Sequence, residues 1–418
     1  MLLLRDFLFN LKKNKIITKK QDYAAYLSSG EIKTTSKFYE LWNNKIQPDS
    51  MQLLSFGNVA SEYNRYFKHT GKIEYLKKAE KSLKKAVEIA AIGKAGYCRA
   101  LARNYISQHR FVDALDMAKE AKKMGSGSKE TNELFFDVYM ELGKYYKAEA
   151  ILKILDDPND FGYLIRLAKW NDYKGDLNKT IAYMEKAKSI AETKNDKDLK
   201  IWSYTNLADY YGHAGRIEDS YNHYLMSLEL DPKNAYAKKG IAWIVFSHER
   251  NPKEALRILN SIMENYESPD YYLLKAEIAD FMGDEMMKSK NLDNYSKIVK
   301  NLNYGAMYNA HNVEFYLNNT KQYKKAIELA QEELKNRETP ETYMLLANSY
   351  FKLGDLDKAV SIIEKKIKGK TYEPNILLQC AKIYKSIGDY SKVEVLKREL
   401  NDAIYELGPN VEQEIAQL

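Results

Sequence analysis

Cysteine, proline and glycine are all scarce in this sequence. Its 418 residues include 2 cysteines, 8 prolines and 19 glycines. So little proline and glycine argues against a collagen-like, linker-rich or turn-dense β architecture. Cys98 and Cys380 lie far apart among largely apolar neighbours. This placement excludes a disulfide framework, matches no paired metal-ligand spacing, and predicts two buried thiols that act as small hydrophobic residues.

Long apolar runs and a large net charge are also missing. No stretch approaches the roughly 18 consecutive apolar residues that a membrane-spanning helix needs. The net charge is +7, and residues 1–20 supply +5 of it, from six basic side chains against Asp6. The remainder is nearly neutral, so we expect no nucleic-acid partner, which would need a basic stripe. The first residues have the wrong order for a secretory signal, and two interpretations stay open: a short amphipathic arm, which we favour, and a vestigial or misassigned leader. Both a cytoplasmic and an envelope or periplasmic location remain open.

A repeated turn organises the chain. A single hydrophobic core stops growing at about 250–300 residues, so 418 residues predict several domains or an array of repeats. Seven glycines and three other residues each stand between two amphipathic segments, with spacings from 32 to 40 residues and a mean near 35. These ten expected turn positions are Gly71, His109, Gly143, Gly175, Gly215, Glu249, Gly283, Lys321, Gly354 and Gly388.

The residues before each turn also repeat. Seven places before it alanine recurs, as Ala102, Ala168, Ala208, Ala242, Ala276, Ala347 and Ala381. Four places before it an aromatic residue recurs, as Phe67, Tyr105, Tyr139, Tyr211, Tyr350 and Tyr384. Offsets of three and four put these residues on one helix face, so each unit is predicted to be a pair of amphipathic helices.

This pattern resembles the tetratricopeptide repeat, a helix–turn–helix unit of about 34 residues. The resemblance covers roughly residues 51–400 and implies an all-α, right-handed superhelix of about ten helix pairs. The first helices of such an array line a concave groove that generally binds peptides or partner proteins. A weaker resemblance, to bacterial envelope-associated tetratricopeptide proteins, rests on the stretch FLFNLKKNKIITKKQDY at residues 7–23, which has no acylated cysteine because Leu11 stands in its place.

The repeats divide the chain into four expected segments. Residues 1–35 form a basic and polar arm, residues 36–50 an N-terminal capping helix, residues 51–400 the solenoid, and residues 401–418 a C-terminal capping helix interrupted by Gly408-Pro409. Terminal caps are expected because each unit of a solenoid buries its face only against its neighbours.

No catalytic or cofactor motif is found in the sequence. It has no GxGxxG, GxxxxGK[ST], GxSxG, HExxH or CxxC pattern, and no two histidines stand three or four residues apart as a helical metal site requires. The repeats also leave no room for a separate catalytic domain. We therefore predict a non-enzymatic protein without cofactor, metal or catalytic residues.

The candidate binding residues lie on the expected inner face of the first helices. Positions six, nine, ten and thirteen before a turn belong to this face. The candidates are Arg99, Arg103, Arg166, Lys169, Trp202, Asn206, Tyr236, Lys239 and Trp243. Arginine binds carboxylates in a bidentate manner and tryptophan and tyrosine offer rigid contact area, so the set suits a peptide with acidic groups or a C-terminal carboxylate. The alternative is that the two tryptophans pack between helices and the arginines pair with nearby glutamates.

Three functions compete. The leading hypothesis is a scaffold that binds a protein or peptide in the concave groove. The alternative is a structural subunit of a larger assembly, for example at the cell envelope, that makes contacts through its convex face and N-terminal arm. An RNA-binding helical repeat is the third, and the near-neutral charge disfavours it. The sequence does not specify the oligomeric state.

Overall fold

The computed structural model describes residues 15–28, 30, 33–47 and 51–418, and this part of the chain is helical without any strand. Twenty helices, α3–α22, form ten consecutive antiparallel pairs, which confirms the predicted fold class. The first four pairs are α3 (Leu53–Thr70) with α4 (Ile73–Ile89), α5 (Lys94–Ser107) with α6 (Phe111–Lys123), α7 (Ser128–Glu141) with α8 (Tyr145–Leu155), and α9 (Phe161–Tyr173) with α10 (Leu177–Thr193).

The remaining six pairs continue the array. They are α11 (Lys197–His213) with α12 (Ile217–Leu230), α13 (Ala235–Trp243) with α14 (Pro252–Met263), α15 (Pro269–Phe281) with α16 (Glu285–Ile298), α17 (Asn309–Asn318) with α18 (Tyr323–Asn336), α19 (Pro340–Leu353) with α20 (Leu356–Ile362), and α21 (Pro374–Ser386) with α22 (Tyr390–Asp402). Short π-helical turns extend α13 (η1, Ile244–His248) and α20 (η3, Ile363–Ile367), and a 3₁₀ turn (η2, Leu302–Tyr304) precedes α17.

The turn between the two helices of a pair requires a left-handed backbone. Nine of the ten expected turn residues have a positive φ, including His109 (56°) and Lys321 (53°), where glycine is missing. The prediction was wrong by one position in the sixth unit: Glu249 has a φ of −86°, and Arg250 carries the positive φ of 56°. The cause is η1, whose wider turn bonds the Glu249 amide to the Ile244 carbonyl and so adds one residue to the helix.

Small and aromatic residues pack as the repeat pattern predicts. Ala102, Ala168, Ala208 and Ala347 are fully buried on the first helices, and so are Ala114, Ala148 and Ala359 on the second helices. Both cysteines are buried and free. The buried apolar residues form several clusters along the array, and those around Leu101, Leu207 and Ile258 each span neighbouring pairs.

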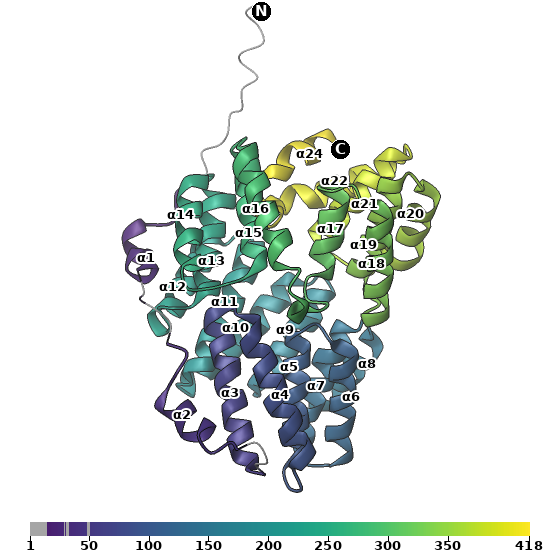
Figure 1. Cartoon of the computed structure of the whole chain (residues 1–418). Coiled ribbons are helices and arrows are strands. Elements are labelled where there is room, and N and C mark those ends of the chain that lie inside the picture. Colours follow the sequence, from purple (N-terminus) through teal and green to yellow (C-terminus); the bar gives the residue numbers. More distant parts are fainter. Residues whose placement is uncertain (1–14, 29, 31–32, 48–50) are drawn as a thin grey trace, which may run out of the picture.

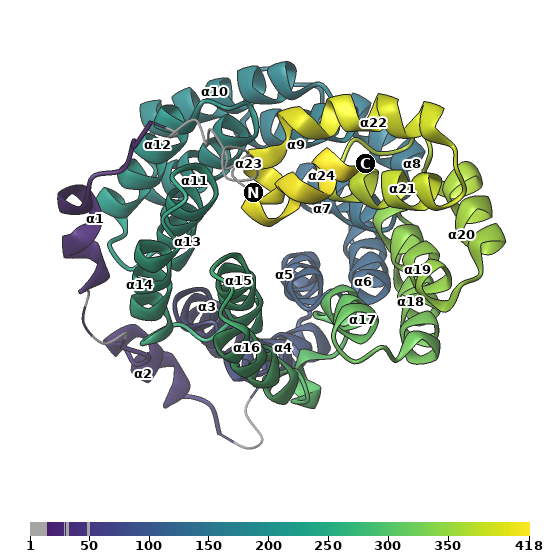
Figure 2. The same ribbon diagram turned by 90° about the horizontal axis from the view of Figure 1, so that it is seen from above.

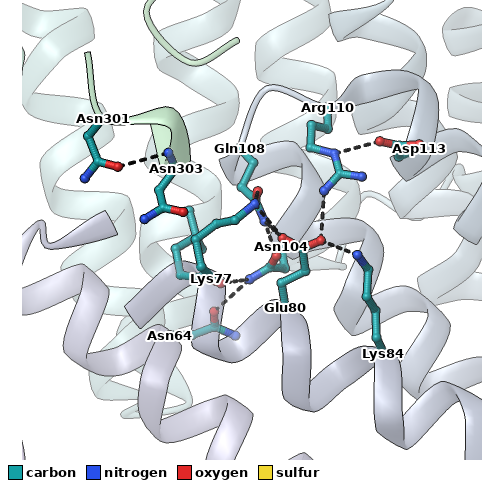
Figure 3. Close-up of polar contacts among 11 residues, drawn as sticks. Asn64, Lys77, Glu80, Lys84, Asn104, Gln108, Arg110, Asp113, Asn301 and Asn303 are labelled. Atoms are coloured by element: carbon teal, nitrogen blue, oxygen red, sulfur yellow. Dashed lines mark hydrogen bonds and ion pairs between the residues drawn. The ribbon is translucent and has the colours of Figure 1, made fainter. Parts of the chain in front are cut away.

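A buried glutamate links the first helix pair to the second. Glu80 on α4 is 5% exposed and accepts hydrogen bonds from Arg110 Nη1 at 2.8 Å and Gln108 Nε2 at 3.0 Å, both from the second pair (Figure 3). Lys77 Nζ at 2.8 Å and Lys84 Nζ at 2.5 Å complete its shell. Burial opposes ionisation of Glu80, but these bonds prevail and lower its pKa to about 2.

The array winds far enough for its second turn to touch its first (Figure 1). The Glu267 amide donates to the Thr70 carbonyl at 2.7 Å, and Asn336 Nδ2 donates to the His109 carbonyl at 2.8 Å. Gly143 lies against Glu338 in the same way, and Gly175 lies against the ring of Tyr372. The hairpin turns of the first four pairs therefore stack on the loops that join later pairs.

The N-terminal segment lies against the middle of the array. Helix α1 (Lys20–Leu27) packs on α12 and α14, beside which it appears in Figure 1. Tyr23 is 1% exposed and donates from its hydroxyl to Glu254 at 2.8 Å, and Thr18 bonds to Glu249. The described part of the expected arm is thus built into the fold. Residues 1–14 lie outside the described residues, and with them residues 7–14 of the stretch that resembles envelope proteins.

The two ends of the array differ. Helix α2 (Lys37–Asn43), within the expected capping segment, packs on α3. The last residues form α23 (Ile404–Leu407), η4 (Pro409–Val411) and α24 (Glu412–Gln417), with the break at Gly408-Pro409. Helix α24 packs on α22, whereas α23 turns back to α11 and η1 in the middle of the array (Figure 2). This tail therefore connects the end of the array with its centre.

Candidate binding groove

Three hollows open among the first helices, the inter-pair loops and the C-terminal tail. The view along the superhelix shows α5, α13, α15 and α17 on its inner side (Figure 2). We name the hollows by their chemistry: the basic hollow (about 620 Å³; Lys68, Arg103, Trp202, Asn206, Tyr236), the tryptophan hollow (about 530 Å³; Asp209, Tyr236, Lys239, Trp243, Asp270, Glu277) and the acidic hollow (about 520 Å³; Glu141, Lys169, Asp172, Arg337, Glu373, Glu406).

The basic hollow brings together four predicted residues from distant helices. Arg103 on α5 faces Trp202 and Asn206 on α11 and Tyr236 on α13. The Arg103 guanidinium, like the Lys68 ammonium on α3, makes no hydrogen bond or ion pair with any other described residue. Asp231 is the one carboxylate among the described residues of this lining. The hollow therefore carries two cations whose hydrogen-bonding capacity is free.

The aromatic side chains of the basic hollow are held in place and remain accessible. Trp202 is 39% exposed and meets Phe161 edge to face, and Tyr236 is 54% exposed. The Tyr236 hydroxyl donates to Asp209 at 2.5 Å, and Tyr224 bonds to the same carboxylate. Asn206, which also lines the hollow, donates from its amide to the Trp202 carbonyl at 2.8 Å. These are rigid surfaces of the kind that dominate peptide recognition.

The other predicted cations are already engaged. Arg166 is 8% exposed and pairs with Asp137 at 2.6 Å. Lys169 pairs with Glu141 and Lys239 with Asp270, at 2.8 and 2.9 Å. Arg166 also lies 3.7 Å from Glu133, the kind of glutamate contact that the alternative interpretation gave for the arginines.

Arg99 lies apart from the three hollows. Its guanidinium donates to the Ser126 carbonyl at 2.9 Å and to the Thr131 hydroxyl at 3.2 Å. Of the four cations expected to make the N-terminal half of the groove basic, Arg103 alone is free of such partners within the described chain.

Trp243 takes part in both packing and the groove. Its indole Nε1 donates to the Tyr405 carbonyl of the C-terminal tail at 3.1 Å, while its ring lines the tryptophan hollow. Ser247 donates to the same carbonyl at 2.6 Å. Glu277 lies on the neighbouring α15, and its carboxylate makes no hydrogen bond or ion pair with a described residue. Burial, with a contribution from Asp280, raises the pKa of Glu277 to about 7.

The acidic hollow was not predicted. Carboxylates of this hollow come from helices α7, α9, α19 and α22, from the loop before α21 and from α23. Burial and the nearby Glu406, Asp172 and Glu341 raise the pKa of Glu373 to about 7. Burial also raises the pKa of Asp172 and of Glu406, the latter 3.6 Å from His213. Sequence reasoning missed this hollow because its residues come from segments that only the superhelical winding brings together.

Glu277 was missed for a different reason. It stands six places before Gly283, the same register as Arg103, Lys169 and Trp243 in their units. Extending the inner-face rule to the seventh unit would have found it.

In the described part of the chain, no cluster of side chains suited to a metal ion occurs, and no helix is long and apolar enough to cross a membrane.

Comparisons with known proteins bear on the fold. A family model described as anaphase-promoting complex, cyclosome, subunit 3 matches residues 319–396. No curated protein matches the sequence. Similar solved structures include a tetratricopeptide repeat protein from Parabacteroides merdae (16% identity, 56% of this chain and 92% of that chain, TM-score 0.39).

Two other similar structures are, by their titles, linked to pili. PilW, described as a widely conserved type IV pilus biogenesis factor, shows 15% identity over 50% of this chain and 96% of its own, with a TM-score of 0.40. Pseudomonas aeruginosa PilF shows 12% identity over 50% and 94%, with a TM-score of 0.37.

The class of protein follows from the helix pairs, their left-handed turns and the family match. The chain is a helical-repeat protein, and its repeats are similar to the tetratricopeptide type, as the sequence pattern indicated. Such repeats generally act as non-enzymatic scaffolds for interactions between proteins.

Proposed function

We propose that this protein is a non-enzymatic scaffold that binds an extended segment of a partner protein along its inner surface. The observation that carries the proposal is the basic hollow, where Arg103 and Lys68 lie near the exposed rings of Trp202 and Tyr236 and form no hydrogen bond or ion pair with any residue that the structure describes. A carboxylate of the partner, in an acidic side chain or at a C-terminus, would accept hydrogen bonds from the guanidinium. Trp202 and Tyr236 would supply apolar contact area at a small cost in conformational entropy.

The proposal is tested by selecting short random peptides against the full-length chain. We expect enriched peptides to share an acidic residue or a free C-terminus, and to bind at least tenfold more weakly to Arg103→Glu and to Trp202→Ala. The matched control is Arg398→Glu, which changes an exposed arginine on α22 outside the three hollows. Folded variants that bind every enriched peptide as tightly as the unaltered protein would refute the groove assignment.

The alternative role, a structural subunit that uses its convex face and N-terminal arm, gains no support from the described part of that arm. Residues 15–28 are occupied by contacts with α12 and α14, and Ser261 donates to the Leu27 carbonyl at 2.6 Å. Deleting residues 1–35 would be a poor test of this role, because it also removes Tyr23 from the core. A loss of partner binding could then come from the missing arm or from a less stable fold. The groove remains the better-supported surface.

A further inference from the structure

The tryptophan hollow contains one carboxylate without a partner. Its three acidic residues are Asp209, Asp270 and Glu277. Asp209 accepts hydrogen bonds from two tyrosine hydroxyls, and Asp270 pairs with Lys239 at 2.9 Å. Glu277 alone among these three has neither a hydrogen bond nor an ion pair with a described residue. An unpaired carboxylate in a partly buried site is destabilising unless it serves a ligand.

An aromatic ring lies close to this carboxylate. A Cβ atom built on Gly408 would lie 2.7 Å from Glu277 Oε1 and 3.1 Å from Trp243 Cη2, so the carboxylate and the indole ring converge on the same glycine. A cation is attracted by a carboxylate and by the face of an indole ring alike. The pair therefore offers two attractive contacts to one positively charged group.

The tryptophan hollow adjoins the basic hollow. Tyr236 lines both of them, so an extended chain bound in one can continue past its ring into the other. The unpaired groups of the two hollows complement each other: Arg103 and Lys68 in one are cations, and Glu277 in the other is a carboxyl group that a bound cation would hold ionised. This arrangement favours a peptide over a free amine, because only a peptide would place charges of both signs in the two hollows together.

We propose that the tryptophan hollow binds a lysine or arginine side chain of the same peptide whose acidic group occupies the basic hollow. This inference rests on the proposed groove function and specifies its ligand as a segment with an acidic and a basic residue at a fixed separation. Glu277 forms the ion pair, and Trp243 contacts the aliphatic stem and the charged group of the side chain. The bound cation favours the ionised form of Glu277 over the neutral form that burial promotes.

The test is a double-mutant cycle on a peptide selected from the random library. The two changes are Glu277→Gln in the protein and the basic residue to norleucine in the peptide. We expect each change alone to weaken binding about tenfold or more, as for a hydrogen bond to a charged group, and the second change to add little once the first is made. Glu285→Gln, an exposed glutamate of the same unit, is the matched control and should leave the cycle unaltered.

The outcomes separate this inference from the groove assignment. Peptides that depend on Arg103 and Trp202, but in which no basic residue couples to Glu277, would overturn the inference and leave the proposed function standing. A library that yields no peptide dependent on Arg103 or Trp202 would overturn both. Thermal unfolding of Glu277→Gln identifies a folding defect, and a Glu277→Asp variant, which keeps the charge, should retain most of the coupling.

Discussion

The contact between successive superhelical turns can be measured by adding one methyl group at Gly71. This glycine ends α3 with a φ of 68°, and a Cβ there would lie 2.1 Å from the Glu267 carbonyl oxygen. Gly215 has the same place in its own pair and a φ of 72°, but no atom lies within 4 Å of its Cβ position. Gly215→Ala is therefore a matched control that keeps the backbone strain and lacks the clash.

The expected magnitudes follow from these geometries. A left-handed alanine costs roughly 1 kcal/mol relative to glycine, which is the whole expected effect of Gly215→Ala. In Gly71→Ala the clash also forces Glu267 away and breaks its 2.7 Å hydrogen bond to the Thr70 carbonyl, which contributes about 1 kcal/mol. Packing of Ile73 and Leu76 on Tyr304, just beside this contact, is then disturbed as well. We expect a total loss of about 3 kcal/mol for Gly71→Ala.

Urea unfolding gives the two losses of stability, and hydrogen exchange shows where they act. In Gly71→Ala we expect faster exchange in residues 67–76 and 266–271, on both sides of the contact, whereas Gly215→Ala should affect its own turn. Because repeat arrays can unfold in parts, the exchange data identify which units respond. If both variants lose the same stability to within about 0.5 kcal/mol, the turns of the superhelix do not support each other, and our reasoning fails.

Three further predictions concern the links between segments. Glu80→Gln should lower the free energy of unfolding by about 3 kcal/mol at pH 7 and by roughly half as much at pH 3. The folded-state pKa of about 2 lies below the unfolded value of 4.5, so ionised Glu80 stabilises the fold above pH 4.5, and this gain is lost as the pH falls towards 2. Urea titrations at the two pH values measure the difference, and a constant loss would contradict it. Tyr23→Phe removes a hydrogen bond to the buried Glu254 and should cost about 1–2 kcal/mol, seen as faster hydrogen exchange in α1 without a change in α3. Gly408→Ala should detach the C-terminal tail from the array, because the φ of Gly408 is 85° and the added methyl group would contact Glu277 and Trp243. Limited proteolysis should then cut after residue 402. An unchanged digestion pattern would count against this contact.

The sequence predicted the repeat because its determinants are local. Alanines and tyrosines at fixed offsets from the turn specify one helix face, and nine turn residues fall where the pattern places them. The exception at Glu249 depends on a π-turn, for which the pattern has no signal. The inner face was predictable in the same way, because Arg103 and Trp202 point into one hollow as their register indicates.

Charge pairing across units was harder to predict. Arg166 and Asp137 lie on successive first helices at inner positions, nine and six places before their turns, and they neutralise each other at 2.6 Å. Comparing the inner positions of adjacent units would have suggested this pair. Contacts between Thr70 and Glu267, or between Trp243 and Tyr405, depend on the small rotation that each helix pair adds to the superhelix. This rotation sums over many units, and the sequence of a single unit contains no signal for it.

The stacking of hairpin turns on later loops has a mechanical consequence. Because successive turns of the superhelix are in contact, it cannot shorten along its axis, and we expect its inner surface to change little when a partner binds. A partner protein must therefore fit the existing inner surface, and it must reach this surface with an unfolded stretch of backbone. We therefore expect intrinsically disordered tails to be better guests than the surfaces of folded domains.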